Sequence, residues 1–281
     1  MTNNTRQLRS RITAVETAVS ITQAMKSVSS LRLKNCREAL SQARVFYEYQ
    51  TEPFALAPSR LVDDALRRIA GRNDAEAHDI LIVVVSSDRG LAGPYNANIA
   101  RAALAEGSKW HRPTFLCLGS KLRNALESRR LSIFQQLSAV ENIDTKVARH
   151  VALAALEAWT VAGTRSVIAF TKFVSSVEHL PELLPLIPPK PGDATSSLRE
   201  SIWEPSAEDA VRLMLPEIVF GAVSLALAES LASETAARVL AMDQATHKAE
   251  EILEHLRCQY HRHRRERITR ELVEAAGRGQ S

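Results

Sequence analysis

The sequence predicts an α/β protein in which a long antiparallel two-helix coiled coil, formed by both termini, carries a central α/β domain of Rossmann-like type. Three observations support this fold class. A long stretch near each end of the chain contains no Gly or Pro, because none precedes Pro53 and none lies between Gly221 and Gly277. Apolar residues in both ends recur at steps of three and four, which is typical of helices. Between the ends, β-branched runs alternate with helical segments, as in α/β layer structures.

The C-terminal helix is predicted from a heptad repeat over about five heptads. Two rows of residues recur every seven positions and together form an a/d seam. The rows are Leu225, Ala232, Val239, Thr246, Leu253 and Tyr260, and Ala228, Thr235, Met242, Ala249 and Leu256. A similar row in the N-terminal segment consists of Leu8, Ile12, Val15, Val19, Thr22, Met25 and Val28.

Helices of about 50 residues are rods about 75 Å long, which exceeds the width of a globule of this size. Each apolar stripe therefore needs an equally long partner. The simplest partner is the other terminal helix, laid antiparallel within the same chain, although pairing between two chains stays open as the alternative. We predict an N-terminal shaft helix over residues 1–56, a central α/β domain over 57–205 and a C-terminal shaft helix over 206–281.

The central part contains apolar, β-branched runs of the kind that form strands buried on both faces of a parallel sheet. The predicted strands are Asp79–Ser86, Pro113–Gly119 and Ser166–Phe173. The predicted helices between and beside them are Ala97–Glu106, Lys121–Ser128 and Thr145–Val161. A polar stretch with prolines and a glycine, residues 188–200, predicts a loop.

Charge is distributed unevenly along the chain. The whole sequence has a formal net charge of +4. Residues 1–45 contain eight basic and two acidic side chains, and residues 255–270 contain six and one, so the middle of the chain is acidic. This asymmetry suggests that the two ends share a partner of negative charge.

The longest apolar stretches, 80–85 and 218–228, fall short of the ~20 residues that a membrane span needs. The first twenty residues lack the apolar core of a secretory signal. The three cysteines, Cys36, Cys117 and Cys258, share no metal-type spacing. We therefore expect a soluble protein on the cytosolic side of the membrane.

A strand-to-helix turn at Ser86–Asn96 is the place where a nucleotide phosphate would bind in an α/β fold. Its glycines, Gly90 and Gly93, match neither the G-x-G-x-x-G order nor a P-loop. A structural turn capped by Asp88 or Asn96 is the simpler interpretation.

Other chemistry is poorly supported. His247, His255, His261 and His263 cluster in one predicted helix, but His261 and His263 are two residues apart, point to different faces and cannot share a metal. We expect no catalytic residue, no bound cofactor and no metal. The basic run Tyr260–Arg267 is typical of a solvated or partner-facing helix, and a nucleic-acid-binding or scaffold function remains the alternative. A stand-alone α/β enzyme with helical arms would need ligand contacts at the Ser86–Asn96 turn.

Three blocks of the chain resemble the gamma subunit of rotary F-type ATP synthases. Arg9–Val28 is similar to the first helix of that family, with its I-T-x-A-M-x-x-V pattern. Ser87–Asn96 (SDRGLAGPYN) is similar to the family turn S-D-R-G-L-C-G-G-x-N. Glu229–Thr246 and Ile268–Leu272 resemble its C-terminal helix. Weaker matches follow in the correct order between these blocks.

The resemblance implies a non-catalytic rotor shaft that couples ion flow through a membrane ring to ATP synthesis or hydrolysis. Its implied partners are the alpha and beta subunits of a catalytic hexamer, the epsilon subunit and the c-subunit ring, with no nucleic acid. Its implied location is peripheral, on the cytoplasmic face of a bacterial cell membrane. The residues that the resemblance assigns to partner contact and coupling are Met25, Arg32, Arg264, Arg265, Thr269 and Glu271.

The sequence departs from the family pattern at several positions. Ala92 replaces the usual Cys of the central turn, Pro94 replaces its second Gly, and Arg265 replaces the Gln that usually follows the arginine matched by Arg264. These departures suggest a divergent branch, such as an alternative bacterial complex. They weaken a direct transfer of the contact between the C-terminal helix and the beta subunits.

Overall fold

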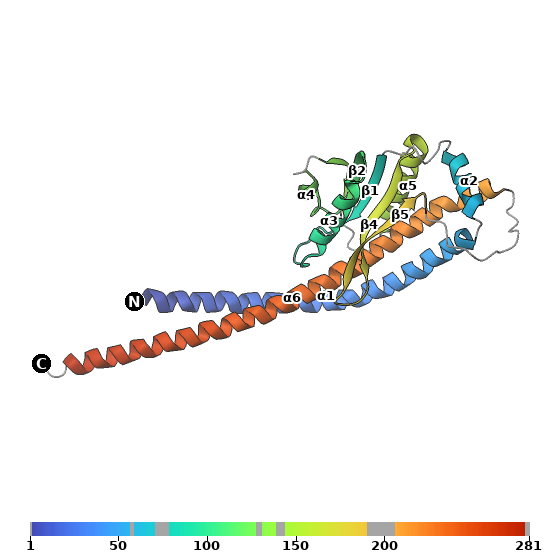
Figure 1. Ribbon diagram of the computed structural model, residues 1–281. Coiled ribbons are helices and arrows are strands. Elements are labelled where there is room, and N and C mark those ends of the chain that lie inside the picture. The colour runs from blue at the N-terminus through green and yellow to red at the C-terminus, as the bar shows by residue number, and fades with distance from the viewer. Residues whose placement is uncertain are drawn as a thin grey trace. The chain divides into compact units, whose positions relative to one another are not determined.

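A computed structural model describes residues 2–56, 59–70, 79–127, 131–138, 144–189 and 206–278 (Figure 1). Its elements, in chain order, are α1 (Thr2–Leu56), α2 (Ser59–Ala70), β1 (Asp79–Val85), α3 (Tyr95–Gly107), β2 (Arg112–Leu118), α4 (Arg123–Glu127), β3 (Ser132–Leu137), α5 (Thr145–Ala162), β4 (Arg165–Phe173), β5 (His179–Ile187) and α6 (Ala207–Arg278). These elements form two compact units. One unit contains α1 up to Ser30 and α6 from Arg238 onward, and the other spans Leu31–Ala237.

The larger unit is built on a five-stranded sheet of order β3-β2-β1-β4-β5. Strands β1, β2, β3 and β4 are parallel to their neighbours, and β5 pairs antiparallel with β4. The three predicted strands are β1, β2 and β4, and their observed bounds lie within one residue of the prediction at each end. The mixed α/β class and the Rossmann-like arrangement of the parallel strands are confirmed.

The sequence analysis missed both edge strands. β5 contains Pro181 and Pro185, which cannot donate to a ladder and are tolerated at a sheet edge. β3 is short and half-exposed, so its apolar pattern is weak. The prediction also missed α2, whose buried face includes Val62 and Leu66. The predicted loop at 188–200 lies almost entirely outside the described residues.

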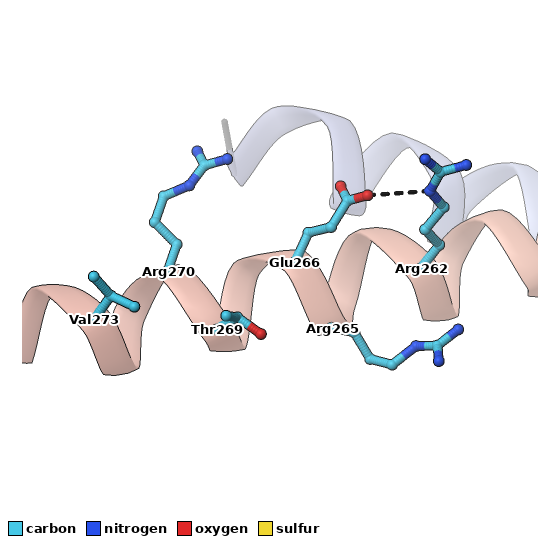
Figure 2. A pocket seen from close by; sticks show the side chains of 6 residues that line it. All are labelled: Arg262, Arg265, Glu266, Thr269, Arg270 and Val273. Atoms are coloured by element: carbon cyan, nitrogen blue, oxygen red, sulfur yellow. Dashed lines mark hydrogen bonds and ion pairs between the residues drawn. The ribbon is translucent and has the colours of Figure 1, made fainter.

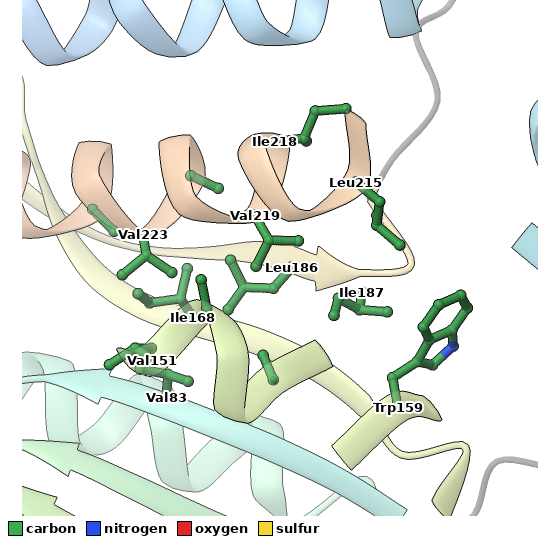
Figure 3. Packing of buried hydrophobic residues seen from close by; sticks show 14 of the residues in the cluster. Val83, Val151, Trp159, Ile168, Leu186, Ile187, Leu215, Ile218, Val219 and Val223 are labelled. Carbon is green, nitrogen blue, oxygen red and sulfur yellow. The ribbon is translucent and has the colours of Figure 1, made fainter. Parts of the chain in front are cut away.

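The two faces of the sheet are covered by different helices. On one face, Ile80, Ile82 and Val84 of β1 pack with α3 and α4. On the other, Leu81, Val83 and Val85 pack with α5 and the first part of α6. Figure 3 shows this second layer, where Val219 and Val223 of α6 lie near Ile168 and Leu186 of the sheet. Burial on both faces explains why β1 has a continuous apolar run.

Helix α5 shows how local sequence sets the bounds of an element. Asp144 is its N-cap and accepts a hydrogen bond from the amide of Lys146 at 2.8 Å. Gly163 follows its last turn in the left-handed conformation and donates to the carbonyl of Trp159 at 2.8 Å. With these two caps, α5 begins at the predicted residue and ends one residue after the predicted Val161.

One helix within the described residues, over Glu208–Arg270, is long and apolar enough by composition to cross a membrane, with a window of mean hydropathy 1.8. Half of that window is buried inside the protein. The prediction that no segment spans a membrane was based on the length of apolar stretches, so it did not include this helix. Leu215, Val219 and Val223 belong to the core cluster on the sheet, which accounts for the apolar character of this helix.

In the larger unit, α1 and α6 meet through small side chains. Cys36 and Leu40 of α1 form a buried cluster with Ala228, Ala232 and Ala236 of α6. The predicted seam residues Ala228 and Ala232 are therefore buried against α1. All residues of the two predicted rows in α6 are buried or half-buried. In α1 the row is wrong at its end, because Val28 is 67% exposed and Ser29 is buried instead.

We expect Ala232→Leu to destabilise the protein by about 1–3 kcal/mol, because a larger side chain at this fully buried site must push the two helices apart. The free energy of unfolding, measured by denaturant titration, provides the test. The control is Ala18→Leu, at an exposed position of α1. Equal stability of the two variants would contradict close packing at Ala232.

Burial also lowers the pKa of His179 below its ordinary value of 6.5. The folded state thus disfavours the protonated ring. The contribution of neutral His179 to the free energy of unfolding is complete above pH 6.5 and declines as the pH falls below that value. We expect the pH dependence of unfolding between about pH 7 and 5 to become shallower in His179→Gln. The control is His111→Gln, the same substitution at an exposed position.

Candidate partner-binding surface of the paired helices

In the smaller unit, α1 and α6 pair through polar contacts that run in opposite chain directions. Lys26 Nζ contacts Asp243 Oδ1 at 2.5 Å, and Thr246 donates from its hydroxyl to Thr22 Oγ1 at 2.8 Å. Nearer the ends of the helices, the Arg257 guanidinium contacts Glu16 Oε1 at 2.7 Å. Residue numbers rise on one helix as they fall on the other. The predicted antiparallel pairing within one chain is confirmed.

Burial decreases along α6 in this unit. Met242 and Thr246 are buried, whereas the later seam residues Leu253, Leu256 and Tyr260 are only half-buried. Most of the described side chains after Tyr260, up to Val273, are exposed. This part of α6, which includes most of the predicted basic run, thus presents most of its described side chains to solvent.

The six residues assigned to coupling by the sequence resemblance lie in separate regions. Met25 is half-buried in the smaller unit, next to Lys26, and Arg32 is half-buried in the larger unit. Arg264, Arg265 and Thr269 are exposed on α6. The side chain of Glu271 lies outside the described part of the chain.

Only Arg265 and Thr269 of this set come together, at an open surface groove of about 650 Å³ (Figure 2). The groove is lined by Arg262, Arg265, Glu266, Thr269, Arg270 and Val273. Arg262, Glu266 and Arg270 follow one another at steps of four, and so do the other three. Arg262 and Glu266 belong to the predicted basic run Tyr260–Arg267, whereas Arg270 and Val273 were not singled out from the sequence. Their spacing could have indicated them, because residues four apart lie on the same face of a helix.

The groove has a basic character. Among the described lining residues one is acidic, and this residue, Glu266, is paired with Arg262, whose Nε lies 3.1 Å from Glu266 Oε1. Within the described residues, neither Arg264 nor Arg265 has a hydrogen-bond or ion-pair partner. A guanidinium can donate two parallel N–H···O bonds to one carboxylate. This surface is therefore suited to an acidic partner.

The strand-to-helix turn after β1 is held by internal hydrogen bonds. The Asn96 side chain accepts from the Ser87 amide at 3.1 Å and donates to Ser87 Oγ at 2.8 Å. Asp88 accepts from the amide of Ser120 at 2.7 Å. The predicted capping of α3 by Asp88 or Asn96 is wrong, because Pro94 occupies the N-cap position and no side chain caps the helix there.

The same turn is in contact with α6. Ala92 and Tyr95 form a small buried cluster with Ala237 of that helix. Leu91, which precedes Ala92, adopts a positive φ of 64°. The turn thus connects the sheet to α6. In the described residues no group of three or more His, Cys, Asp or Glu side chains is arranged to hold a metal.

Comparisons with known proteins agree with this architecture. A family model described as ATP synthase matches residues 4–277. An ATP synthase gamma chain from Anaeromyxobacter sp. (strain Fw109-5) is 35% identical, with 96% of each chain covered. Another from Lachnoclostridium phytofermentans is 31% identical, again with 96% of each chain covered.

Solved structures show the same fold. The rotor of the Euglena gracilis mitochondrial ATP synthase matches with a TM-score of 0.70 at 19% identity, covering 95% of this chain and 100% of that one. The central stalk and c-ring structure from Tetrahymena thermophila matches with a TM-score of 0.59 at 21% identity, covering 80% and 99%. The fold is therefore that of a central-stalk protein. The chain belongs to the ATP synthase gamma chain family.

Lys26 lowers the pKa of Asp243, chiefly through its hydrogen bond to the carboxylate. We expect Lys26→Met to raise the pKa of Asp243 towards its ordinary value, as followed by NMR titration of the carboxyl carbon. Lys248→Met removes a charge of the same sign that pairs with Glu251, and serves as the control. An unchanged pKa in Lys26→Met would show that the two helices do not pair as described.

Proposed function

We propose that this chain is the central rotor shaft of an F-type ATP synthase and couples ion flow through a membrane ring to ATP synthesis or hydrolysis. The observation that carries the proposal is the full-length match to gamma chains together with the antiparallel pairing of α1 and α6. Within the complex the chain itself is not catalytic. The alternative, a nucleic-acid-binding scaffold, has no support from these matches.

The proposed partners follow from the family and from the charge of the surface. The basic last third of α6 and α1 face acidic parts of the alpha and beta subunits, and the α/β domain contacts the epsilon subunit and the c-ring. The proposed parts are a shaft helix over 1–56, an α/β domain over 57–205 and a second shaft helix over 206–281. The location is peripheral, on the cytoplasmic face of a bacterial membrane.

The physical mechanism is a population shift. A rotor whose sides differ makes different contacts with three chemically identical sites, and a ligand shifts an equilibrium only by its differential affinity for the two states. In this chain the exposed surfaces differ, since α6 exposes Arg262, Arg265 and Arg270, whereas α1 exposes the apolar Ile21 and Val28. Rotation then exchanges the affinities of the three sites.

We propose that Met25, Arg32, Arg264, Arg265, Thr269 and Glu271 contact the partner subunits. The first two lie on α1 and the others on the last part of α6. Lys26, the neighbour of Met25, pairs with Asp243 of α6. At 1.5 Å per residue, Asp243 lies about 30 Å before Arg264 along this helix. These residues therefore form separate contacts rather than one site.

Co-purification from the native cell tests the function directly. The chain should copurify with alpha and beta subunits in a ratio of one to three of each, the number of sites that a single rotor serves. Recovery of the chain alone, or with nucleic acid whose binding weakens steeply with salt, would overturn the proposal.

Met25→Lys should uncouple the complex partly. The new ammonium lies next to Lys26, which already pairs with Asp243 at 2.5 Å, and adds a competing charge at the helix pair. We expect ATP hydrolysis to survive better than ion transport when both are measured on the same reconstituted complexes. Met25→Leu is the control that keeps the site apolar. A strictly proportional loss of both activities would deny Met25 a special role in coupling.

Arg264→Ala should weaken assembly or slow turnover. Loss of a hydrogen bond to a charged group costs about 1.5–3 kcal/mol, so the affinity of the shaft for the hexamer should fall about tenfold or more. Arg265→Ala should have a smaller effect, because the family has an uncharged residue there. Lys248→Ala, which removes an exposed charge from the same helix, is the control. A larger effect of Arg265→Ala would reverse the proposed roles.

A further inference from the structure

An ion pair in the larger unit, between the half-exposed side chain of Arg44 and the buried carboxylate of Glu229, connects three elements. The carboxylate of Glu229, in the middle of α6, is almost fully buried with 3% of the residue exposed. Its Oε1 atom lies 2.8 Å from Arg44 Nε and 2.7 Å from Arg44 Nη2 of α1. Its Oε2 atom accepts the amide N–H of Phe173, the last residue of β4, at 2.7 Å. The Arg44 guanidinium also donates to the carbonyl oxygen of Phe173 at 3.0 Å.

Two serines of α6 extend this contact along β4. Ser230 Oγ accepts the amide of Thr171 at 3.2 Å, and Ser233 donates to the Thr171 carbonyl at 3.0 Å. The ladder between β1 and β4 reaches only as far as Ala169. Thr171 and Phe173 are two residues apart, so their backbone groups point to the same edge of the strand. Beyond the end of β1, side chains of α6 therefore form the hydrogen bonds to the backbone edge of β4 that a neighbouring strand would otherwise form.

The chemistry of this contact differs from that of the surrounding seam. The neighbouring contacts between α1 and α6 involve Cys36, Leu40 and three alanines, and apolar contacts of this kind are non-directional. Hydrogen bonds to ionised groups are short and directional. Here they fix the rotation of both helices relative to the end of β4.

We propose that Arg44, Glu229 and the end of β4 form a torsional clamp through which the α/β domain and the two shaft helices turn together. Glu229 acts as a positioning residue, because it contacts neither nucleotide nor ion in this arrangement. The inference rests on the proposed rotor function and adds the residue through which torque enters the shaft. α6 continues from Glu229 to Arg278 as one helix and transmits the rotation onward.

The test uses complexes reconstituted in vesicles with Arg44→Lys or Glu229→Gln in the full-length chain. Arg44→Lys keeps the charge but loses the planar geometry that reaches both Glu229 and the Phe173 carbonyl. ATP hydrolysis should stay near the wild-type rate, whereas ions transported per ATP should fall about two- to thirty-fold, the range that coupling changes of this kind cover. The control is Glu182→Gln, which breaks an exposed ion pair with Lys172 on the same pair of strands.

A cross-link distinguishes the contact between α1 and α6 from the contact between α6 and β4, the two connections that the clamp makes. Cys36 Sγ lies 3.8 Å from Thr235 Oγ1, so Thr235→Cys followed by oxidation joins α1 to α6 without touching β4. Cys258→Ser removes the exposed thiol from this background. In Glu229→Gln the disulfide should fail to restore transport per ATP. Full restoration would show that the contact with β4 is dispensable and would overturn the proposal.

The remaining outcomes are also decisive. Unchanged transport per ATP in both Arg44→Lys and Glu229→Gln, with circular dichroism matching the wild type, overturns the clamp. If Glu229→Gln does not assemble, Arg44→Lys alone decides the question by the same ratio. If the wild-type chain itself neither joins the hexamer nor supports transport, the proposed function fails rather than the clamp.

Discussion

A 72-residue helix cannot bury its own apolar stripe, and the structure depends on how α6 solves this constraint. Its first part lies on the sheet, where Leu215, Val219 and Val223 join the main core. Its middle and last parts pair with α1. One continuous helix therefore belongs both to the α/β core and to the coiled coil. A rotation of α6 about its axis would change the packing in both.

The pairing of α1 with α6 changes its chemistry along the chain. Near the sheet it consists of alanines, Cys36 and Leu40, together with the pair between Arg44 and the buried Glu229 carboxylate. In the smaller unit Met242 is buried, and the ion pairs Lys26–Asp243 and Glu16–Arg257 are partly exposed. Exposed ion pairs contribute little stability. The ion pairs of the smaller unit therefore add little to the pairing, whereas the buried Glu229 carboxylate depends on its contacts with Arg44 and Phe173.

This difference suits a shaft that must be fixed at one end and make adjustable contacts at the other. Buried, directional contacts are costly to break because they leave an unpaired charge behind. Exposed arginines can exchange water for the carboxylates of a partner at small cost. The groove at Arg262–Val273 and the contact at Phe173 therefore have distinct roles on the same helix.

Sequence alone determined the elements whose signals are local. The heptad rows of α6, the apolar run of β1 and the capping pair Asp144 and Gly163 each specify their element without help from the rest of the chain. The resemblance of three motif blocks determined the family. Tertiary structure decided the rest. The edge strands β3 and β5 exist because a neighbouring strand offers its free hydrogen bonds, and Ser29 rather than Val28 is buried because the approach of α6 sets which face of α1 is covered. The pairing of Arg44 with Glu229, 185 positions apart, arises only when two helices and a strand end meet, and no pattern along a single chain encodes such a meeting.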